Sequence, residues 1–311
     1  MKTLMNDEKH YITLNNYLKN RFGCKVFRIS LNAGMSCPNR DSSIDNTGCL
    51  YCSSNLSGDF AGKKELSFQK QFEEIKKIMQ RKWPEGSYIA YLQAGSNTYN
   101  DPLTLKNIYE EIISLDKKIL VLSIATRPDC INLEIIKVLK EIQKQKEIWI
   151  ELGFQTMYDE TKDSLHIGYH NSDFEQAMKL LNENEIPVIV HIINGLPKET
   201  KEMMIETIKY LNQFNLSGIK IHMLHILKNT PLADIFQNQP FKVLSKDEFI
   251  EITVEQLRYL KPHVVVHRIT GDPDKNDLIE PAWVLKKFVV LNDIDKLMRK
   301  NKYYQGDLWE E

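Results

Sequence analysis

Short apolar runs alternate with longer amphipathic segments along most of the chain. Seven runs read as buried strands, at residues 26–31, 88–93, 119–125, 148–154, 188–193, 218–224 and 264–269. Between them, apolar positions recur at helical spacing, which predicts helices at 65–82, 103–116, 133–143, 174–184, 201–214 and 246–260. Repeated units of this length with short connections are typical of right-handed β-α crossovers and a parallel sheet.

The expected fold is therefore α/β, a partial (βα)6 TIM-type barrel with short N- and C-terminal extensions. We divide the chain into an N-terminal basic extension at 1–24, a core barrel at 25–230 and a C-terminal extension at 231–311 that covers the barrel. In barrels of this kind, functional groups lie at the carboxyl ends of the strands. Polar residues that follow each strand are therefore the first candidates for a site.

Composition is that of a globular protein, with 42% hydrophobic residues in 311. No apolar run approaches the roughly 20 residues that a membrane-spanning helix needs. The first ten residues, M-K-T-L-M-N-D-E-K-H, lack the apolar core of a signal peptide. These features predict a cytoplasmic protein with no membrane partner.

Charge is balanced overall but not locally. The net charge of −1 does not indicate a nucleic-acid binder, yet residues 15–30 carry four cations and no acidic residue: Lys19, Arg21, Lys25 and Arg28. Aromatic rings are interleaved with these cations, as in surfaces that meet phosphates and stack on bases. An ordinary solvated face, with the rings in the core, explains the same pattern.

Three of the five cysteines are close in sequence. Cys37, Cys49 and Cys52 have the spacing C-x11-C-x2-C, whereas Cys24 and Cys130 stand apart. Disulfides are disfavoured because the count is odd and nothing indicates export. Zinc would need a fourth ligand, for which His10 and His170 are candidates. An iron–sulfur cluster held by three thiolates would leave one iron open for another ligand.

The stretch C-P-N-R-D that begins at Cys37, with Tyr51 inside the final C-x2-C, resembles the radical S-adenosylmethionine (SAM) superfamily. It is most similar to a bacterial subfamily close to the elongator catalytic subunit, although the usual superfamily spacing is C-x3-C-x2-C. The resemblance implies a [4Fe-4S] cluster on the three cysteines, with SAM on the fourth iron. It also implies reductive cleavage of SAM to a 5′-deoxyadenosyl radical, and an electron donor such as flavodoxin or ferredoxin.

The same resemblance implies a SAM pocket built at the strand ends. The segments that carry it are Q-A-G-S-N-T-Y, E-L-G-F-Q-T and G-L-P-K-E-T. The expected cofactor-binding residues are Tyr51, Gly95, Ser96, Arg127, Glu151, Gln155, His191 and Gly195. Pro128 holds Arg127 extended, which suits bidentate pairing with a carboxylate or phosphate. The same segments are also explained without a cofactor, as plain turns, a helix cap and a structural polar network. Arg268, near the end of the last strand, is a candidate substrate contact.

The substrate is the least constrained prediction. Because the elongator catalytic subunit acts on the wobble uridine of tRNA, the resemblance points to tRNA, with remodelling of a substituent that the wobble uridine already carries. The N-terminal cations would bind the tRNA. We expect no acetyltransferase domain after the barrel. Two alternatives remain open: a radical SAM enzyme that acts on a small metabolite or porphyrin, and a non-catalytic, zinc-stabilised RNA-binding protein.

Overall fold

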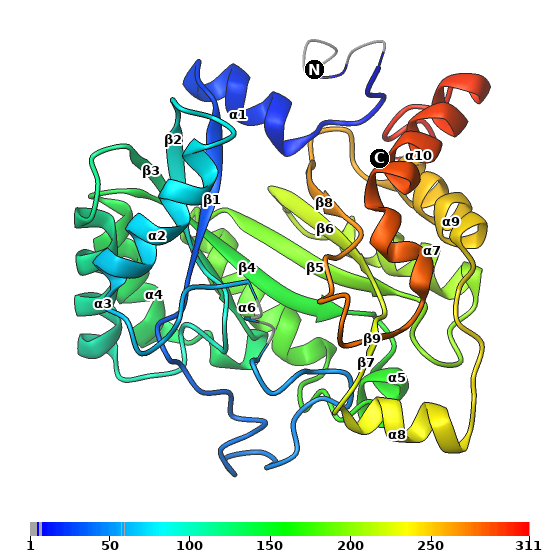
Figure 1. The fold of residues 1–311 in the computed structure, drawn as a ribbon, viewed down its shortest axis with the longest axis horizontal. Coiled ribbons are helices and arrows are strands. Elements are labelled where there is room, and N and C mark those ends of the chain that lie inside the picture. Colours follow the sequence, from blue (N-terminus) through cyan, green and yellow to red (C-terminus); the bar gives the residue numbers. More distant parts are fainter. Residues whose placement is uncertain (1–4, 6–7, 57, 59, 311) are drawn as a thin grey trace.

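The computed structural model describes residues 5, 8–56, 58 and 60–310. Its centre is a parallel sheet of seven strands in the order β1-β2-β3-β4-β5-β6-β8, curled into a half-barrel with helices on its outer side (Figure 1). The strands are β1 (Val26–Leu31), β2 (Ser87–Leu92), β3 (Ile119–Thr126), β4 (Glu147–Gln155), β5 (Val188–Asn194), β6 (Gly218–Met223) and β8 (Val265–Ile269). A small antiparallel pair, β7 (Ile226–Leu227) and β9 (Leu278–Glu280), lies beside it.

Helices fill the connections. They are α1 (Leu14–Phe22), α2 (Phe68–Gln80), α3 (Pro102–Ser114), α4 (Leu133–Gln143), α5 (Asp159–Ser164), α6 (Asn171–Glu183), α7 (Lys201–Leu211), α8 (Pro231–Asn238), α9 (Lys246–Tyr259) and α10 (Lys287–Asn301), with 3-10 turns η2 (Pro128–Cys130) and η3 (Ala282–Lys286). Several begin at side-chain caps: Ser67, Asp101 and Ser245 each accept a hydrogen bond from a backbone N–H in the first helical turn.

The α/β half-barrel is confirmed, with one difference in the number of strands. The sequence pattern gave six barrel strands and left 264–269 in the covering segment. In the structure β8 pairs in parallel with β6, so the sheet continues to a seventh strand. The intervening α8 and α9 provide the long crossover that parallel pairing requires. The short strands β7 and β9 and the helices α1, α5, α8 and α10 were not predicted.

The interior of the half-barrel is layered because side chains alternate along each strand. The lowest layer is apolar, with Val26, Ile89, Val121, Trp149 and Ile189 packed together over Leu18 of α1. Two residues further along each strand, the inward positions become polar: Arg28, Tyr91, Ser123, Glu151, His191 and Lys220. The apolar floor therefore closes one end, and the polar layers face the carboxyl ends of the strands.

Among the described residues, none of the helices has the length and apolar character needed to cross a bilayer.

Candidate cofactor site

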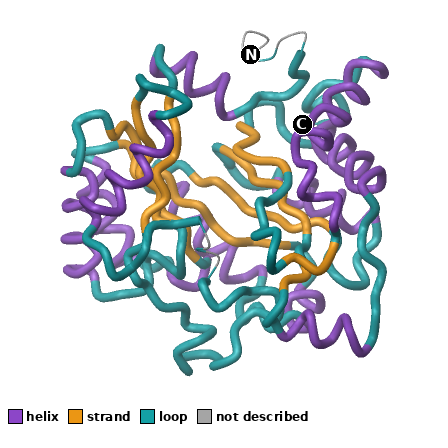
Figure 2. The backbone as a smooth tube through the Cα atoms, in the orientation of Figure 1, coloured by secondary structure: helices purple, strands orange, loops and turns teal. Residues whose placement is uncertain are grey.

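A cavity of about 340 Å³ opens at the carboxyl ends of the strands. Long loops gather at this end of the molecule, on the opposite side from α1 (Figure 2). The cavity is lined by Cys37, Cys49 and Cys52, and by polar residues from β2 to β6 and from the segment that follows β8. All three predicted metal ligands therefore face the same space.

The loop that carries the cysteines is held by side chains within it. Asn39 is buried and donates to the carbonyl of His166 at 2.6 Å and to the sulfur of Cys49 at 3.6 Å. Arg40 donates to the carbonyl of Cys52 at 2.7 Å. Gly48 has a φ of 78°, which favours glycine, and a Cβ there would lie 2.4 Å from Nε of Arg40 and displace that side chain. These contacts preorganise the loop around the thiols.

The arrangement of donors fits a multi-iron cluster better than a zinc ion. Within the part of the chain that the structure describes, no three His, Cys, Asp or Glu side chains converge on a single-ion site. The two candidate fourth ligands for zinc are engaged elsewhere: His10 contacts the carbonyl of Tyr303 at 2.8 Å, and His170 contacts Asp163 at 2.9 Å. Three thiols around one cavity match a cluster that leaves one iron for another ligand.

Arg127 is buried beside the cysteine loop. Its Nε and Nη2 donate to Asp129 at 2.9 and 2.7 Å, and the guanidinium also donates to the carbonyls of Ile167 at 3.0 Å and Gly168 at 3.2 Å. Nη1 additionally lies 3.9 Å from Sγ of Cys37. Its five N–H donors therefore all have protein partners. The bidentate carboxylate expected for Arg127 is that of Asp129, and contact with SAM remains a prediction.

Gly95 and Ser96 lie at the end of β2 against the cysteine loop. Gly95 has a φ of 73°, and a Cβ there would lie 2.3 Å from the carbonyl oxygen of Met35. Its N–H donates to the carbonyl of Leu56 at 3.2 Å, and Ser96 N–H donates to that of Ser36 at 3.0 Å. This turn therefore fastens both arms of the loop while it lines the cavity.

Gln155 ends β4 and lines the cavity. Its φ of 69° is uncommon for a residue with a side chain, and the register of the sheet shifts between Gly153 and Gln155. Strained backbone of this kind clusters at binding sites. Its amide donates to the hydroxyl of Tyr169 at 3.5 Å, and the contact of Gln155 with SAM stays a prediction.

Glu151 lies four residues earlier on β4, about 13 Å along the strand from Gln155. It is fully buried, and its two oxygens meet Ser123 at 2.6 Å, His191 at 2.8 Å, Arg28 at 3.2 Å and Lys220. A carboxylate has about four acceptor positions. Protein partners occupy them all, so Glu151 anchors a buried network; a direct contact with SAM remains a prediction.

The remaining predicted cofactor residues divide into two groups. Tyr51 and His191 line the cavity, and the predicted substrate contact Arg268 lines it too, paired with Asp272. Gly195 does not line this cavity. It lies against Leu244, in a separate hollow bordered by the G-L-P-K-E-T turn.

Lys19, Arg21 and Lys25, which we expected to bind tRNA, lie at the end of the barrel opposite the cavity. Arg21 pairs at 2.7 Å with Glu147, the first residue of β4, and Lys25 precedes β1 and contacts Asn15 at 2.6 Å. Lys19 is exposed on α1, which Figure 1 shows opposite the cysteine loop. Arg28 points into the barrel instead, toward Glu151. Two of the four cations of this acid-free run therefore pair with acids, and both acids belong to β4.

Sequence reasoning missed Lys220, Asn39 and Tyr169. Lys220 was read only as part of an apolar strand, although a lysine inside a buried run needs a partner. Tyr169 donates its hydroxyl to the carbonyl of Gly153 at 2.8 Å and carries Arg127 4.8 Å above its ring. The H-I-G-Y-H segment at residues 166–170 thus supports Arg127, which directly follows β3.

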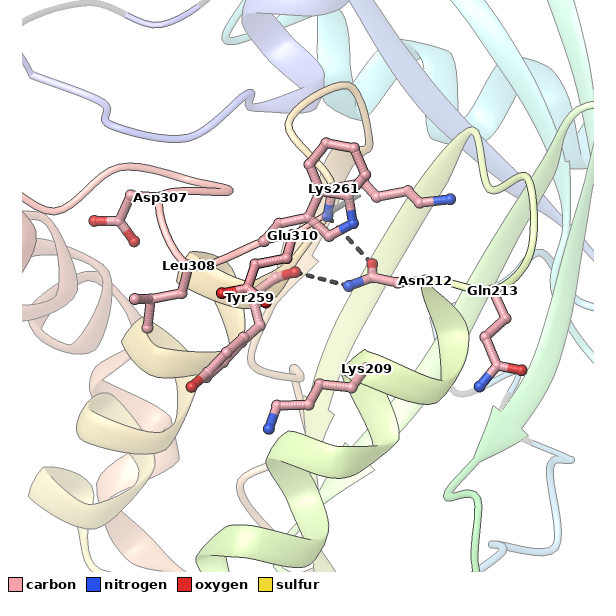
Figure 3. Close-up of a pocket in the computed structure, with 9 residues that line it drawn as sticks. Lys209, Asn212, Gln213, Tyr259, Lys261, Asp307, Leu308 and Glu310 are labelled. Atoms are coloured by element: carbon pink, nitrogen blue, oxygen red, sulfur yellow. Dashed lines mark hydrogen bonds between the residues drawn. The ribbon is translucent and has the colours of Figure 1, made fainter.

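A larger hollow lies at the other end of the barrel, between the ends of α7 and α9 and the C-terminal residues (Figure 3). There Asn212 donates to the carbonyl of Tyr259 at 2.7 Å and accepts from the N–H of Lys261 at 3.2 Å. These polar groups satisfy one another, and no cysteine is near. The size of this hollow alone does not make it the cofactor site.

Comparison with known proteins agrees with this geometry. A model of the radical SAM superfamily matches residues 45–211, more than half of the chain. The chain belongs to the radical SAM superfamily. A model of the radical SAM C-terminal domain matches residues 216–300. The enzyme accordingly uses a [4Fe-4S] cluster and SAM.

Three relatives illustrate the range of similarity. The enzyme is 39% identical to YtqA, an uncharacterised protein of Bacillus subtilis, over 305 residues, covering 98% of this chain and 94% of the relative. It is 29% identical to the tRNA uridine(34) acetyltransferase of Methanocaldococcus jannaschii over 189 residues, covering 60% of this chain and 33% of that protein. The solved structure of Elp3 from Methanocaldococcus infernus has the same fold, with a TM-score of 0.67 at 18% identity, covering 90% of this chain and 64% of that one.

Proposed function

We propose that this radical SAM enzyme modifies tRNA by remodelling a substituent that the wobble uridine already carries. The observation that carries the proposal is the 29% identity to a protein named as a tRNA uridine(34) acetyltransferase. That match covers only 33% of the acetyltransferase, so acetyl transfer itself is not part of the proposal.

The cavity suits a base that enters from the carboxyl ends of the strands. When bound, the cluster and SAM supply radical chemistry, and an external one-electron donor such as flavodoxin or ferredoxin is required. The protein itself holds and orients the cofactors and the substrate, and it excludes water from the cavity. Asn39 and Arg40 fix the cysteine loop, Gln155 and His191 line the wall, and Arg268, which lines the same cavity, would contact the substrate.

The tRNA backbone would meet cations near this cavity rather than those near α1. Lys228 and Lys275 are exposed. Lys228 lines a small hollow next to the cysteine loop, together with Ser53 and Asn55. Lys275 is close to this hollow in sequence, because Asp274 and Asp277, which flank it, line the hollow too. If each lysine contacts a phosphate, its loss lowers the log–log salt slope of tRNA binding by roughly 0.7–0.9.

Nucleoside profiling tests the reaction. We expect tRNA from cells without the gene to accumulate a precursor at the wobble uridine. Wild-type protein should restore the profile, whereas Cys49→Ala should not. An unaltered wobble-uridine profile would contradict the proposal and favour a small-molecule substrate.

Charge reversal tests the binding face. We expect Lys228→Glu with Lys275→Glu to weaken tRNA binding at low salt and to reduce the salt slope. Lys19→Glu with Lys25→Glu, at the opposite end of the barrel, is the matched control and should change neither. If the Lys19→Glu and Lys25→Glu double variant lost tRNA binding and the other did not, the N-terminal cations would be the tRNA contact.

A further inference from the structure

The polar layer inside the barrel contains three buried or half-buried charges from three strands. Arg28 of β1 and Lys220 of β6 both contact Glu151 of β4, at 3.2 Å for Arg28. We call Arg28, Glu151 and Lys220 the ionic layer. With both cations protonated, it holds one positive charge more than it holds negative.

Other groups around the ionic layer do not supply the missing negative charge. Burial, together with Lys220, lowers the pKa of His191 to about 4, and burial lowers the pKa of His222 and His267 well below the usual value, so all three rings are neutral. Nearer the opening, Asp272 is shared by Arg268 and by Lys287, the latter at 2.8 Å. Among the described residues, positive charge therefore exceeds negative charge at two depths of the cavity, in the ionic layer and around Asp272.

Hydrogen-bonding capacity is also left over. Lys220 contacts Glu151 and the hydroxyl of Tyr91, at 3.3 Å, which accounts for two of its three donors among the described residues. Nε of Arg28 is buried without a partner in the same part of the chain. Glu151 has no acceptor position left, so these donors cannot be satisfied by turning toward it.

SAM does not balance this charge. Its sulfonium is positive, and by the family resemblance its only carboxylate would bind, together with the amino group, the iron that the three cysteines leave open. A second cation in the same cavity repels the sulfonium unless an anion lies between them or beside the cation. An uncompensated buried charge is costly, and a ligand that neutralises it regains that free energy.

We propose that Lys220 and Arg28, balanced in part by Glu151, form an anion site inside the barrel that binds a negatively charged group of the substrate. The inference deepens the proposed function, since the anionic group would be the substituent of the base or a phosphate attached to it. Lys220 and Glu151 line the cavity, and Arg28 lies behind them. Lys220 would contact the anion directly, and Arg28 would act through the charge balance.

The proposal predicts a definite pH dependence. Burial and the nearby Arg28 lower the pKa of Lys220 to about 7. Charged and titratable groups that face it come from five other strands and from β6 itself: Arg28, Tyr91, Glu151, His191, His267 and Arg268, with His222. Because the protonated lysine binds the anion, affinity should be full below pH 7 and fall as the pH rises above it. Binding should take up about one proton where the free lysine is deprotonated.

The experiment uses anaerobically reconstituted enzyme with SAM and without reductant, so that no turnover occurs. The probes are 5-carboxymethyluridine, its methyl ester and uridine 5′-monophosphate, measured by calorimetry. We expect the acid to bind at least about tenfold more tightly than the ester. A preference for the monophosphate instead would support the anion site and assign it to a phosphate.

Two single variants remove the excess charge without leaving an unpaired ion. Lys220→Met leaves Arg28 with Glu151, and Arg28→Met leaves Lys220 with Glu151, so each retains a balanced pair. Lys220→Met should abolish the anion preference. Arg28→Met should weaken it and move the fall in affinity to a higher pH. Glu151→Gln removes the negative charge of the ionic layer. It therefore increases the excess of positive charge and should tighten binding of the acid.

Equal affinity for all three probes in the wild type, or a preference retained in Lys220→Met, would overturn the proposal. Propionate, a carboxylate without a base, separates this result from the proposed function. Propionate binding that depends on Lys220, combined with an unaltered tRNA profile, would support the anion site and reject tRNA. An altered tRNA profile without any anion preference would support the proposed function and reject the anion site.

Discussion

Nη1 of Arg127 lies 3.9 Å from Sγ of Cys37. The two residues are far apart in sequence, at the end of β3 and at the start of the cysteine loop. Asp129 holds the other edge of the guanidinium at 2.7 Å and 2.9 Å. A permanent positive charge is thus fixed beside one of the three sulfurs that would hold the cluster.

Arg127→Gln should therefore impair cluster loading. The variant loses the charge next to Cys37 and the hydrogen bonds to the carbonyls of Ile167 and Gly168. Hydrogen bonds from charged groups contribute about 1.5–3 kcal/mol each. We expect fewer irons per chain after anaerobic reconstitution and a lower melting temperature of the apoprotein. Normal iron content would show that Arg127 is only structural.

The cysteines should divide into three essential and two dispensable residues. Alanine at Cys37, Cys49 or Cys52 should abolish the cluster, whereas Cys24→Ala and Cys130→Ala should retain about four irons per chain, the content of one [4Fe-4S] cluster. Neither control residue lines the cavity that holds the other three. Iron analysis and the visible absorption spectrum of reconstituted protein measure this. Stoichiometric zinc in the wild type would contradict the prediction.

Sequence pattern predicted the regular elements well where one physical signal dominates. The apolar run of β3 and the amphipathic α4 (Leu133–Gln143) are each long enough to be recognised without their neighbours. Helix α1 was missed, although Leu14, Leu18 and Phe22 recur at helical spacing and Thr13 and Gly23 are ordinary helix caps. The strand pair β7 and β9 is too short for any periodicity to appear.

The charges were harder to place, because their partners come from other strands. Arg28 read as a surface cation next to Lys25, but alternation along β1 turns it inward to Glu151. Glu151 was predicted as a SAM contact, which stays untested, but its hydrogen bonds with Ser123 and His191 of neighbouring strands were not foreseen. Which inward residues meet depends on the register of neighbouring strands, which one sequence does not show.

SAM affinity provides a test of the end of β4. Gln155→Ala should weaken SAM binding by about ten- to a hundredfold, since a hydrogen bond to a charged partner contributes roughly 1.5–3 kcal/mol. Iron content should be unchanged. Gln143→Ala, on the outer helix α4, is the control. Calorimetry on reconstituted protein measures both, and equal affinities would remove Gln155 from the SAM site.

Glu199, in the turn between β5 and α7, makes stability depend on pH. Its Oε1 is buried and has no partner among the described residues, and burial raises the pKa of the carboxyl from 4.5 to about 7. Between these values the unfolded chain releases the proton while the folded protein keeps it. Ionisation therefore favours unfolding, and the contribution of Glu199 to stability is lost as the pH rises from 4.5 to 7.

Glu199→Gln should remove this dependence, because a neutral amide resembles the protonated acid. At pH 5 the variant and the wild type should have similar melting temperatures. At pH 8 the variant should be more stable by roughly 1–3 kcal/mol, since one unit of pKa shift corresponds to about 1.4 kcal/mol. Glu202→Gln, in the first turn of α7 and exposed, is the matched control. Parallel pH profiles for wild type and Glu199→Gln would show that the carboxyl of Glu199 is ionised in the folded protein at pH 5.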